Sequence, residues 1–377
     1  MPQNYLVRTW LIVIVLISTQ ACKTSSADSR MSYSSGFQVL RAIDTSRTYK
    51  PNASSDDYLR HRLVDIDIWY PAQLAPTDQP LRFHNLLGLL EFRANYYTNT
   101  NTATGITNRI AKSLCEGFAC SDSARLLSLE TNTYDQPTPA IGKFPVILYL
   151  ASYNGMAYEN YQLFERLSSQ GFVVVSISSI GRYPGDMTMK KADMMEQVND
   201  AMFALRHLPG KLYLDLTKIG ILGYSWGSMA AASLASRIPG ISCIVDWDGS
   251  TFHHYGANPA EDADFDSIRN GAFHNLKITI PYLRMESTKV DTTQRYKAVY
   301  NFLEKVKGPH FVLGIDAAAH EDFSSLPSAT RQSGNCTSDS VYQTISTLTI
   351  SYFEDHLEGK HSFDTQLKKQ QHSLHQR

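Results

Sequence analysis

The chain has 377 residues, of which 43% are hydrophobic and 19% are charged. This composition excludes a disordered chain, and the length allows one large domain or two ordinary ones with a sizeable buried core. The 35 Lys and Arg residues nearly cancel the 36 Asp and Glu residues, which leaves a net charge of −1. Binding to phosphates needs clustered excess basic charge, so this balance argues against nucleic acid as a principal partner.

The first 22 residues are predicted to be an export signal and not part of the fold. Arg8 supplies positive charge, residues 10–17 are apolar, and the uncharged stretch 9–21 is shorter than the about 20 residues that span a bilayer. With Cys22 directly after it, the segment resembles a bacterial lipoprotein signal. The resemblance implies lipidation of Cys22 and a membrane-anchored chain that faces the periplasm or the exterior. Cleavage after Ala21, which would give a periplasmic or secreted protein, is the alternative.

Export would place the four remaining cysteines in an oxidising compartment, where disulfides are permitted. Cys115 and Cys120 are five residues apart and suit a small loop, whereas Cys243 lies in an apolar run and is compatible with a buried residue. Cys336 is the fourth, and spacing does not determine which residues pair. No cysteine or histidine pair has the spacing of a zinc site, so no metal is predicted.

After a tether at residues 23–36, residues 37–360 are predicted to form one α/β domain. Alternation of polar and apolar residues over 64–69 predicts a half-exposed strand that ends at Pro71. Residues 81–142 are irregular and rich in Asn and Thr, and we expect a long insertion or cap with one helical stretch near 106–127. The polar tail at residues 361–377 is predicted to be frayed.

Strands and helices alternate after the insertion. The apolar runs at 144–150 and 172–178 are continuous, as in strands buried on both faces. The order predicts a mostly parallel sheet with helices on both faces. Further strands are expected at 219–222, 241–247, 278–285 and 311–315, and helices at 159–169, 191–208, 229–238, 296–306 and 341–357.

The strongest local signal is Gly-Tyr-Ser-Trp-Gly at residues 223–227, between an apolar strand and an Ala-rich helix. In this context the pattern predicts a nucleophile elbow, in which a strained turn presents the Ser225 hydroxyl above the sheet. The following helix N-terminus supplies donors where an oxyanion would form. A serine needs a base, and His320 follows the last apolar strand at the same end of the sheet. His310 precedes that strand and is rejected.

The acid that orients His320 has three candidates. Asp246 and Asp248 end the strand that follows the nucleophile helix, and Asp291 follows the next strand. Asp246 is also compatible with a structural role held by backbone donors, and Asp291 with the N-cap of a helix.

These motifs, together with residues 152–161 and 320–324, resemble the α/β-hydrolases grouped with platelet-activating-factor acetylhydrolases and dienelactone-hydrolase-like esterases. The resemblance covers about residues 37–357 and implies the α/β-hydrolase fold. It favours Asp248 as the acid, with Asp246 as the fallback. It also implies oxyanion donors at the Trp226 and Asn154 N–H groups. Asn154 lies in Ala-Ser-Tyr-Asn-Gly, where the family usually has Ser-His-Gly-x-Gly.

The function expected from these residues is that of an exported serine hydrolase that cleaves carboxylic esters without a metal or organic cofactor. The expected partner is a small ester or lipid substrate. Two alternatives stay open: an acetylhydrolase acting on short acyl chains of phospholipids, and a non-catalytic hydrolase fold used as a surface binding module.

Overall fold

The structure is a computed structural model that describes residues 33–49, 54–55, 57, 60–98, 102–118, 120, 122–181, 187–208, 213–252, 259–289, 300–334 and 340–376. The predictions for Cys22 and Asp291 lie outside the described residues, as does Cys336.

The described strands form one 12-stranded sheet. Its order is β12-β11-β10-β9-β8-β6-β7-β2-β1-β4-β3, and β5 pairs with β2. From β7 to β11 all neighbours are parallel, so the carboxyl ends of these strands meet at one edge. The strands are β1 (Ser34–Thr48), β2 (His61–Gln73), β3 (Pro80–Arg82), β4 (Glu130–Asp135), β5 (Thr138–Pro139), β6 (Phe144–Leu150), β7 (Val173–Ile177), β8 (Leu214–Tyr224), β9 (Ile241–Trp247), β10 (Tyr282–Ser287), β11 (His310–Ile315) and β12 (Leu374–Gln376).

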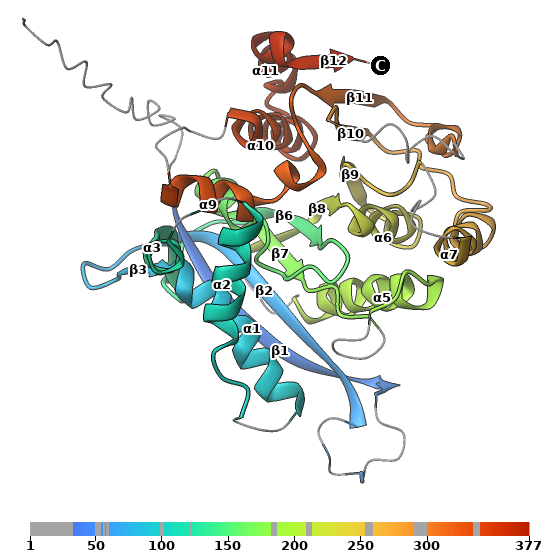
Figure 1. Cartoon of the computed structure of the whole chain (residues 1–377). Coiled ribbons are helices and arrows are strands. Elements are labelled where there is room, and N and C mark those ends of the chain that lie inside the picture. The colour runs from blue at the N-terminus through green and yellow to red at the C-terminus, as the bar shows by residue number, and fades with distance from the viewer. Residues whose placement is uncertain are drawn as a thin grey trace, which may run out of the picture.

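Helices cover both faces of this sheet, as predicted (Figure 1). One apolar core lies beneath α5, α6 and α7, and the other lies beneath α1, α4, α10 and α11. In the part of the chain that is described, no helix is both long and apolar enough to cross a membrane. The α-helices are α1 (Phe83–Thr98), α2 (Ile106–Gly117), α3 (Ser123–Ser128), α4 (Tyr161–Ser169), α5 (Lys191–His207), α6 (Trp226–Ala235), α7 (Pro259–Asn270), α9 (Ser325–Gly334), α10 (Ser340–Phe353) and α11 (Phe363–Gln370).

Strand β2 differs from its prediction in length and burial. It continues through Pro71 to Gln73, and it is buried on both faces. The reason is that α1 covers its polar face, where Arg93 donates to Asp65 (3.0 Å) and to Asp67 (2.7 Å). Acidic residues that looked exposed in the sequence are therefore paired in the interior.

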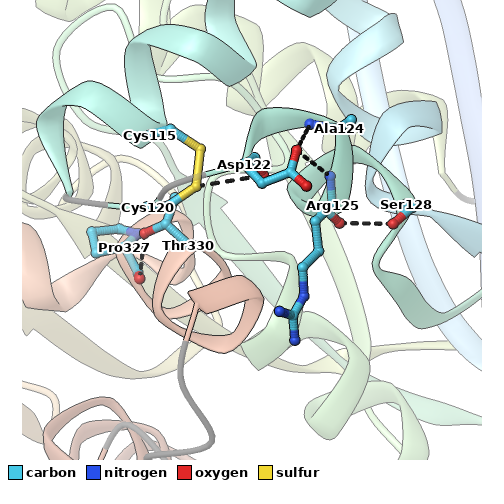
Figure 2. The surroundings of a disulfide bond; sticks show 8 residues. All are labelled: Cys115, Cys120, Asp122, Ala124, Arg125, Ser128, Pro327 and Thr330. Atoms are coloured by element: carbon cyan, nitrogen blue, oxygen red, sulfur yellow. Dashed lines mark hydrogen bonds between the residues drawn. A yellow bond between two sulfur atoms is a disulfide. The ribbon is translucent and has the colours of Figure 1, made fainter.

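The insertion at residues 81–142 is part of the sheet edge as well as a helical layer. Strand β4 pairs with β1, and β3 pairs with β4. The single helical stretch expected near 106–127 is two helices, α2 and α3, and α1 precedes them. A disulfide joins Cys115 of α2 to Cys120, which lies between α2 and α3, beside Pro327 and Thr330 of α9 (Figure 2). The insertion therefore packs against the segment that follows His320.

The described elements extend past the predicted domain boundaries at both ends. The tether was expected to reach residue 36, but β1 already begins at Ser34 and pairs with β2. The tail after residue 360 is not frayed, because α11 buries Phe363 and β12 pairs with the edge strand β11. An edge strand offers unpaired backbone groups, and the polar tail satisfies them without needing an apolar sequence.

Two internal elements also differ from expectation. The described part of the helix predicted at 296–306 is only a short 3-10 helix, η2 (Phe302–Lys305). Helix α6 begins at Trp226, three residues earlier than predicted, because it starts directly from the serine turn. A π-helix, η4 (Glu354–Glu358), follows α10, and short 3-10 helices lie at η3 (His320–Phe323) and η5 (Gln371–Ser373).

Candidate active site

Ser225 lies on the sharp turn between β8 and α6. Its backbone has φ 55° and ψ −119°, a conformation that non-glycine residues rarely adopt. A Cβ at Gly227 would lie 2.0 Å from the Leu150 carbonyl oxygen, and one at Gly223 would lie 2.6 Å from Ser228 Cα. Both glycines are therefore needed for the close approach of α6 to the strands. The Ser225 carbonyl accepts from the Ser250 N–H (3.2 Å), which links the turn to the loop after β9.

His320 connects Ser225 to a buried carboxylate. It lies in η3, just beyond the carboxyl end of β11. Its Nε2 is 2.9 Å from Ser225 Oγ, and its Nδ1 is 2.7 Å from Asp248 Oδ2. The imidazole is 39% exposed and the carboxylate is fully buried, so the histidine is reachable from solvent while its partner is shielded. His310 starts β11 at the opposite end of the sheet, as expected.

Asp248 is held from several sides. It follows β9 with φ 43°, and its N–H donates to the Met285 carbonyl oxygen (2.7 Å). The Ser287 N–H donates to Oδ1 (3.0 Å), and the Ser287 hydroxyl donates to Oδ2 (2.8 Å). A carboxylate with this many donors keeps its orientation toward His320. The motifs did not single out Ser287, although a polar residue at the carboxyl end of a parallel strand is a usable signal.

Asp246 has a different environment from Asp248. Its carboxylate accepts from the Gly249 N–H (2.8 Å), from Arg284 (3.0 Å) and from the Tyr282 hydroxyl. These partners tie the β9 loop to β10. Of the two acids that the sequence placed on this strand end, Asp248 contacts His320, and Asp246 has the structural environment that was its alternative.

Tyr224, the residue before Ser225, fixes the backbone of the histidine. Its hydroxyl donates to the His320 carbonyl oxygen (2.9 Å), and the two rings lie 5.3 Å apart. Burial raises the pKa of Tyr224 well above its ordinary value, so the phenol keeps the proton that it donates. Strand β8 thus leads into the serine turn and also holds the main chain of His320.

The loop after β6 contains the second predicted oxyanion donor. The Asn154 N–H donates to Met187 Sδ at 3.3 Å, and Asn154 has φ 54°. An oxyanion bound to this N–H would therefore have to displace the sulfur. Trp226, the residue after the serine, is buried, and the Tyr153 ring packs edge-on against it at 6.2 Å. The role of Asn154 stays a prediction.

The described residues contain no group of three or more His, Cys, Asp or Glu side chains that could hold a metal ion. What they do bring together is a serine, an imidazole and a carboxylate in one hydrogen-bonded series. In this geometry the imidazole can accept the serine proton while the carboxylate orients it.

The sheet order and the serine turn decide the fold. From β1 to β11 the core strands run in the order β1, β2, β7, β6, β8, β9, β10, β11, with Ser225 directly after the central strand β8. A ferulic acid esterase from Streptomyces cinnamoneus superposes over 88% of this chain and 92% of its own, with a TM-score of 0.58 and 16% identity. The chain has the α/β-hydrolase fold.

Within this α/β-hydrolase fold, the sequence model of the chlorophyllase family matches residues 134–244. That range includes the loop after β6 and Ser225 but ends before Asp248 and His320. No curated protein matches the chain significantly.

Proposed function

We propose that this protein is an exported serine hydrolase that cleaves carboxylic esters through an acyl-enzyme on Ser225. The observation that carries the proposal is the hydrogen-bonded series Ser225–His320–Asp248 at the carboxyl edge of the sheet. The match to the chlorophyllase family model and the structural similarity to a ferulic acid esterase support ester chemistry in this fold.

The reaction begins with proton transfer. His320 Nε2 takes the proton of the Ser225 hydroxyl as the oxygen attacks the ester carbonyl. The tetrahedral oxyanion accepts hydrogen bonds from the Trp226 N–H, at the start of α6, and from a donor in the loop after β6, for which Asn154 is the predicted residue.

Collapse of the intermediate breaks the bond to the leaving alcohol, which takes its proton from His320. Water, deprotonated by the same imidazole, then attacks the acyl-enzyme and releases the carboxylic acid and free Ser225. Asp248 remains ionised and stabilises the imidazolium in both halves of the cycle.

Two observations support the other parts of the proposal. The disulfide between Cys115 and Cys120 favours an oxidising compartment and so an exported location. The insertion packs against α9, next to the histidine segment, which is where a specificity element would influence the acyl or alcohol group.

The test is covalent labelling of the purified mature chain with a fluorophosphonate, read by intact mass and peptide mapping. We expect one adduct, on Ser225, together with hydrolysis of 4-nitrophenyl acetate. Ser225→Ala should lose the adduct and lower turnover by about 10⁶-fold while the melting temperature stays near that of the wild type. Hydrolysis that survives in the folded alanine variant would overturn the assignment.

A further inference from the structure

A buried carboxylate that the proposed reaction does not use lies beneath the site. Glu159, in the loop between β6 and α4, is only 4% exposed. Its Oε1 accepts from the Tyr149 hydroxyl (2.5 Å) and from the Ser152 N–H (2.8 Å), and its Oε2 accepts from the Ser152 hydroxyl (2.6 Å). A Cβ at residue 155 would lie 2.5 Å from Oε2, so Gly155 leaves the room that the carboxylate needs. The side chain therefore clamps the start of the loop that contains Asn154.

The main chain of the same residue holds the histidine segment. The Glu159 carbonyl oxygen accepts from the Ser325 N–H (3.1 Å) and hydroxyl (2.8 Å), and from the Ser324 hydroxyl (3.1 Å). These two serines directly follow η3, which carries His320. Asn160 adds a further contact, because its Oδ1 accepts from the Ser325 N–H (3.0 Å). Two segments that are about 170 residues apart in the sequence thus meet at one residue.

Burial and nearby charge act on the Glu159 carboxyl group in opposite directions. Burial raises the pKa of Glu159, whereas the hydrogen bonds from Ser152 and Tyr149 and the charge of a protonated His320 act in the opposite direction. The carboxylate nevertheless contacts neither Ser225 nor any atom that reacts in the mechanism above. Its effect on the reaction must pass through the segments that it holds.

We propose that Glu159 is a positioning residue that locks the loop after β6 to the histidine segment, so that the oxyanion donor and the base keep a fixed geometry around Ser225. This inference rests on the proposed function, because the geometry matters only if Ser225 is acylated. A displacement of about 1 Å at a reacting group can cost about 100-fold in rate, so loss of the clamp should appear in kcat.

The chain offers a matched control in Glu165. This second glutamate is similarly buried, at 5% exposure, and also accepts from one backbone N–H, that of Asn132 (2.7 Å), and from a hydroxyl, that of Thr133 (2.7 Å), one hydroxyl fewer than Glu159. Its hydrogen-bond donors are residues of β4, and not of the loop after β6 or the histidine segment. Glu159→Ala and Glu165→Ala should both lower the melting temperature, which separates the cost to stability from the effect on the reaction.

The experiment compares kcat and KM for 4-nitrophenyl acetate in both alanine variants and in Glu159→Gln. We expect Glu159→Ala to lower kcat by about 10- to 100-fold with KM within about threefold, and Glu165→Ala to keep kcat within about threefold. Glu159→Gln preserves an oxygen acceptor of the same shape and should restore kcat to within about threefold of the wild type. Equal kcat values for the two alanine variants, or a glutamine variant as slow as Glu159→Ala, would overturn the proposal.

Two further measurements keep the outcome decisive. If Glu159→Ala does not fold, Ser152→Ala removes the hydroxyl contact alone and should lower kcat by about 3- to 10-fold, and an unchanged kcat would count against the clamp. Hydrogen exchange does not depend on activity: peptides covering residues 151–158 and 318–326 should exchange faster in Glu159→Ala than in Glu165→Ala. An inactive, unlabelled wild type would overturn the proposed function, whereas unchanged exchange would overturn the clamp.

Discussion

At the scale of single residues, the two acids at the end of β9 have different environments. Asp248 reaches His320 and is oriented by Ser287. Asp246 is instead part of a buried network with Arg284 and Tyr282. Asp248 is only two positions beyond Asp246, but its backbone adopts a left-handed conformation. This turn directs the Asp248 side chain to His320.

This separation predicts different phenotypes for the two amide variants. Asp248→Asn should lower kcat for 4-nitrophenyl acetate by about 10³- to 10⁴-fold, because the amide no longer orients the imidazole, with little change in melting temperature. Asp246→Asn should instead destabilise the fold by about 3 kcal/mol, because it weakens the pairing of the buried Arg284, and should retain most of kcat. Kinetics and chemical denaturation of both variants check this. A reversed pattern would move the acid to Asp246.

At the scale of elements, buried polar contacts join pieces that the sequence presents separately. Helix α1 is fastened to β2 through Arg93, and α4 is fastened to β4 through Glu165. Each contact satisfies a charge or a carboxyl group that would otherwise be costly inside the protein. The edge strands of the insertion thus become a rigid part of the sheet.

The carboxyl group on α4 predicts a pH dependence of stability. Burial raises the pKa of Glu165 to about 7, against 4.5 in the unfolded chain, so the native state binds more protons between these values. Stability due to this group is therefore fully present below about pH 4.5 and is lost as the pH rises toward 7, by about 3 kcal/mol.

Glu165→Gln removes the titration and keeps the acceptor oxygen. The difference in unfolding free energy between this variant and the wild type should shift in favour of the variant by about 3 kcal/mol from pH 4.5 to pH 8. Urea denaturation at both pH values measures it. A difference that does not change with pH would show that Glu165 ionises in the folded protein as readily as in the unfolded chain.

At the scale of the whole molecule, the polar tail completes the sheet. Strand β12 pairs with β11, the strand that leads to His320, and α11 packs against it. The Phe363 ring lies 5.2 Å from that of Phe311 and 5.1 Å from that of Tyr352. Residues 363–376 therefore support the strand that leads to His320.

Removal of this anchor should destabilise the fold. Phe363→Ala should cost about 3 to 5 kcal/mol, because it leaves a cavity in the second core. Lys369→Ala, at an exposed position of the same helix, should stay within about 0.5 kcal/mol of the wild type. Thermal unfolding monitored by circular dichroism compares the two. Equal stability would mean that the tail contributes little to the fold in solution.

The local patterns of the sequence were enough to predict the class of fold and to single out Ser225 and His320 as candidates. Continuous apolar runs indicate strands buried on both faces, and the glycines around Ser225 allow a turn that few sequences permit. Their positions after strands placed His320, Asp246 and Asp248 at the same edge as Ser225, because parallel strands end together. These features depend on neighbours within a few residues, which the sequence displays directly.

Only the tertiary structure decided which polar groups meet across long stretches of chain. The choice between Asp246 and Asp248, the burial of β2, the folding back of the tail and the main-chain contacts of Glu159 all depend on partners more than 25 residues away. A polar residue has the same appearance in a sequence whether it faces water or a buried partner. Its role is set by the cost of desolvation and by the groups that offset it, and those groups come together only in the folded chain.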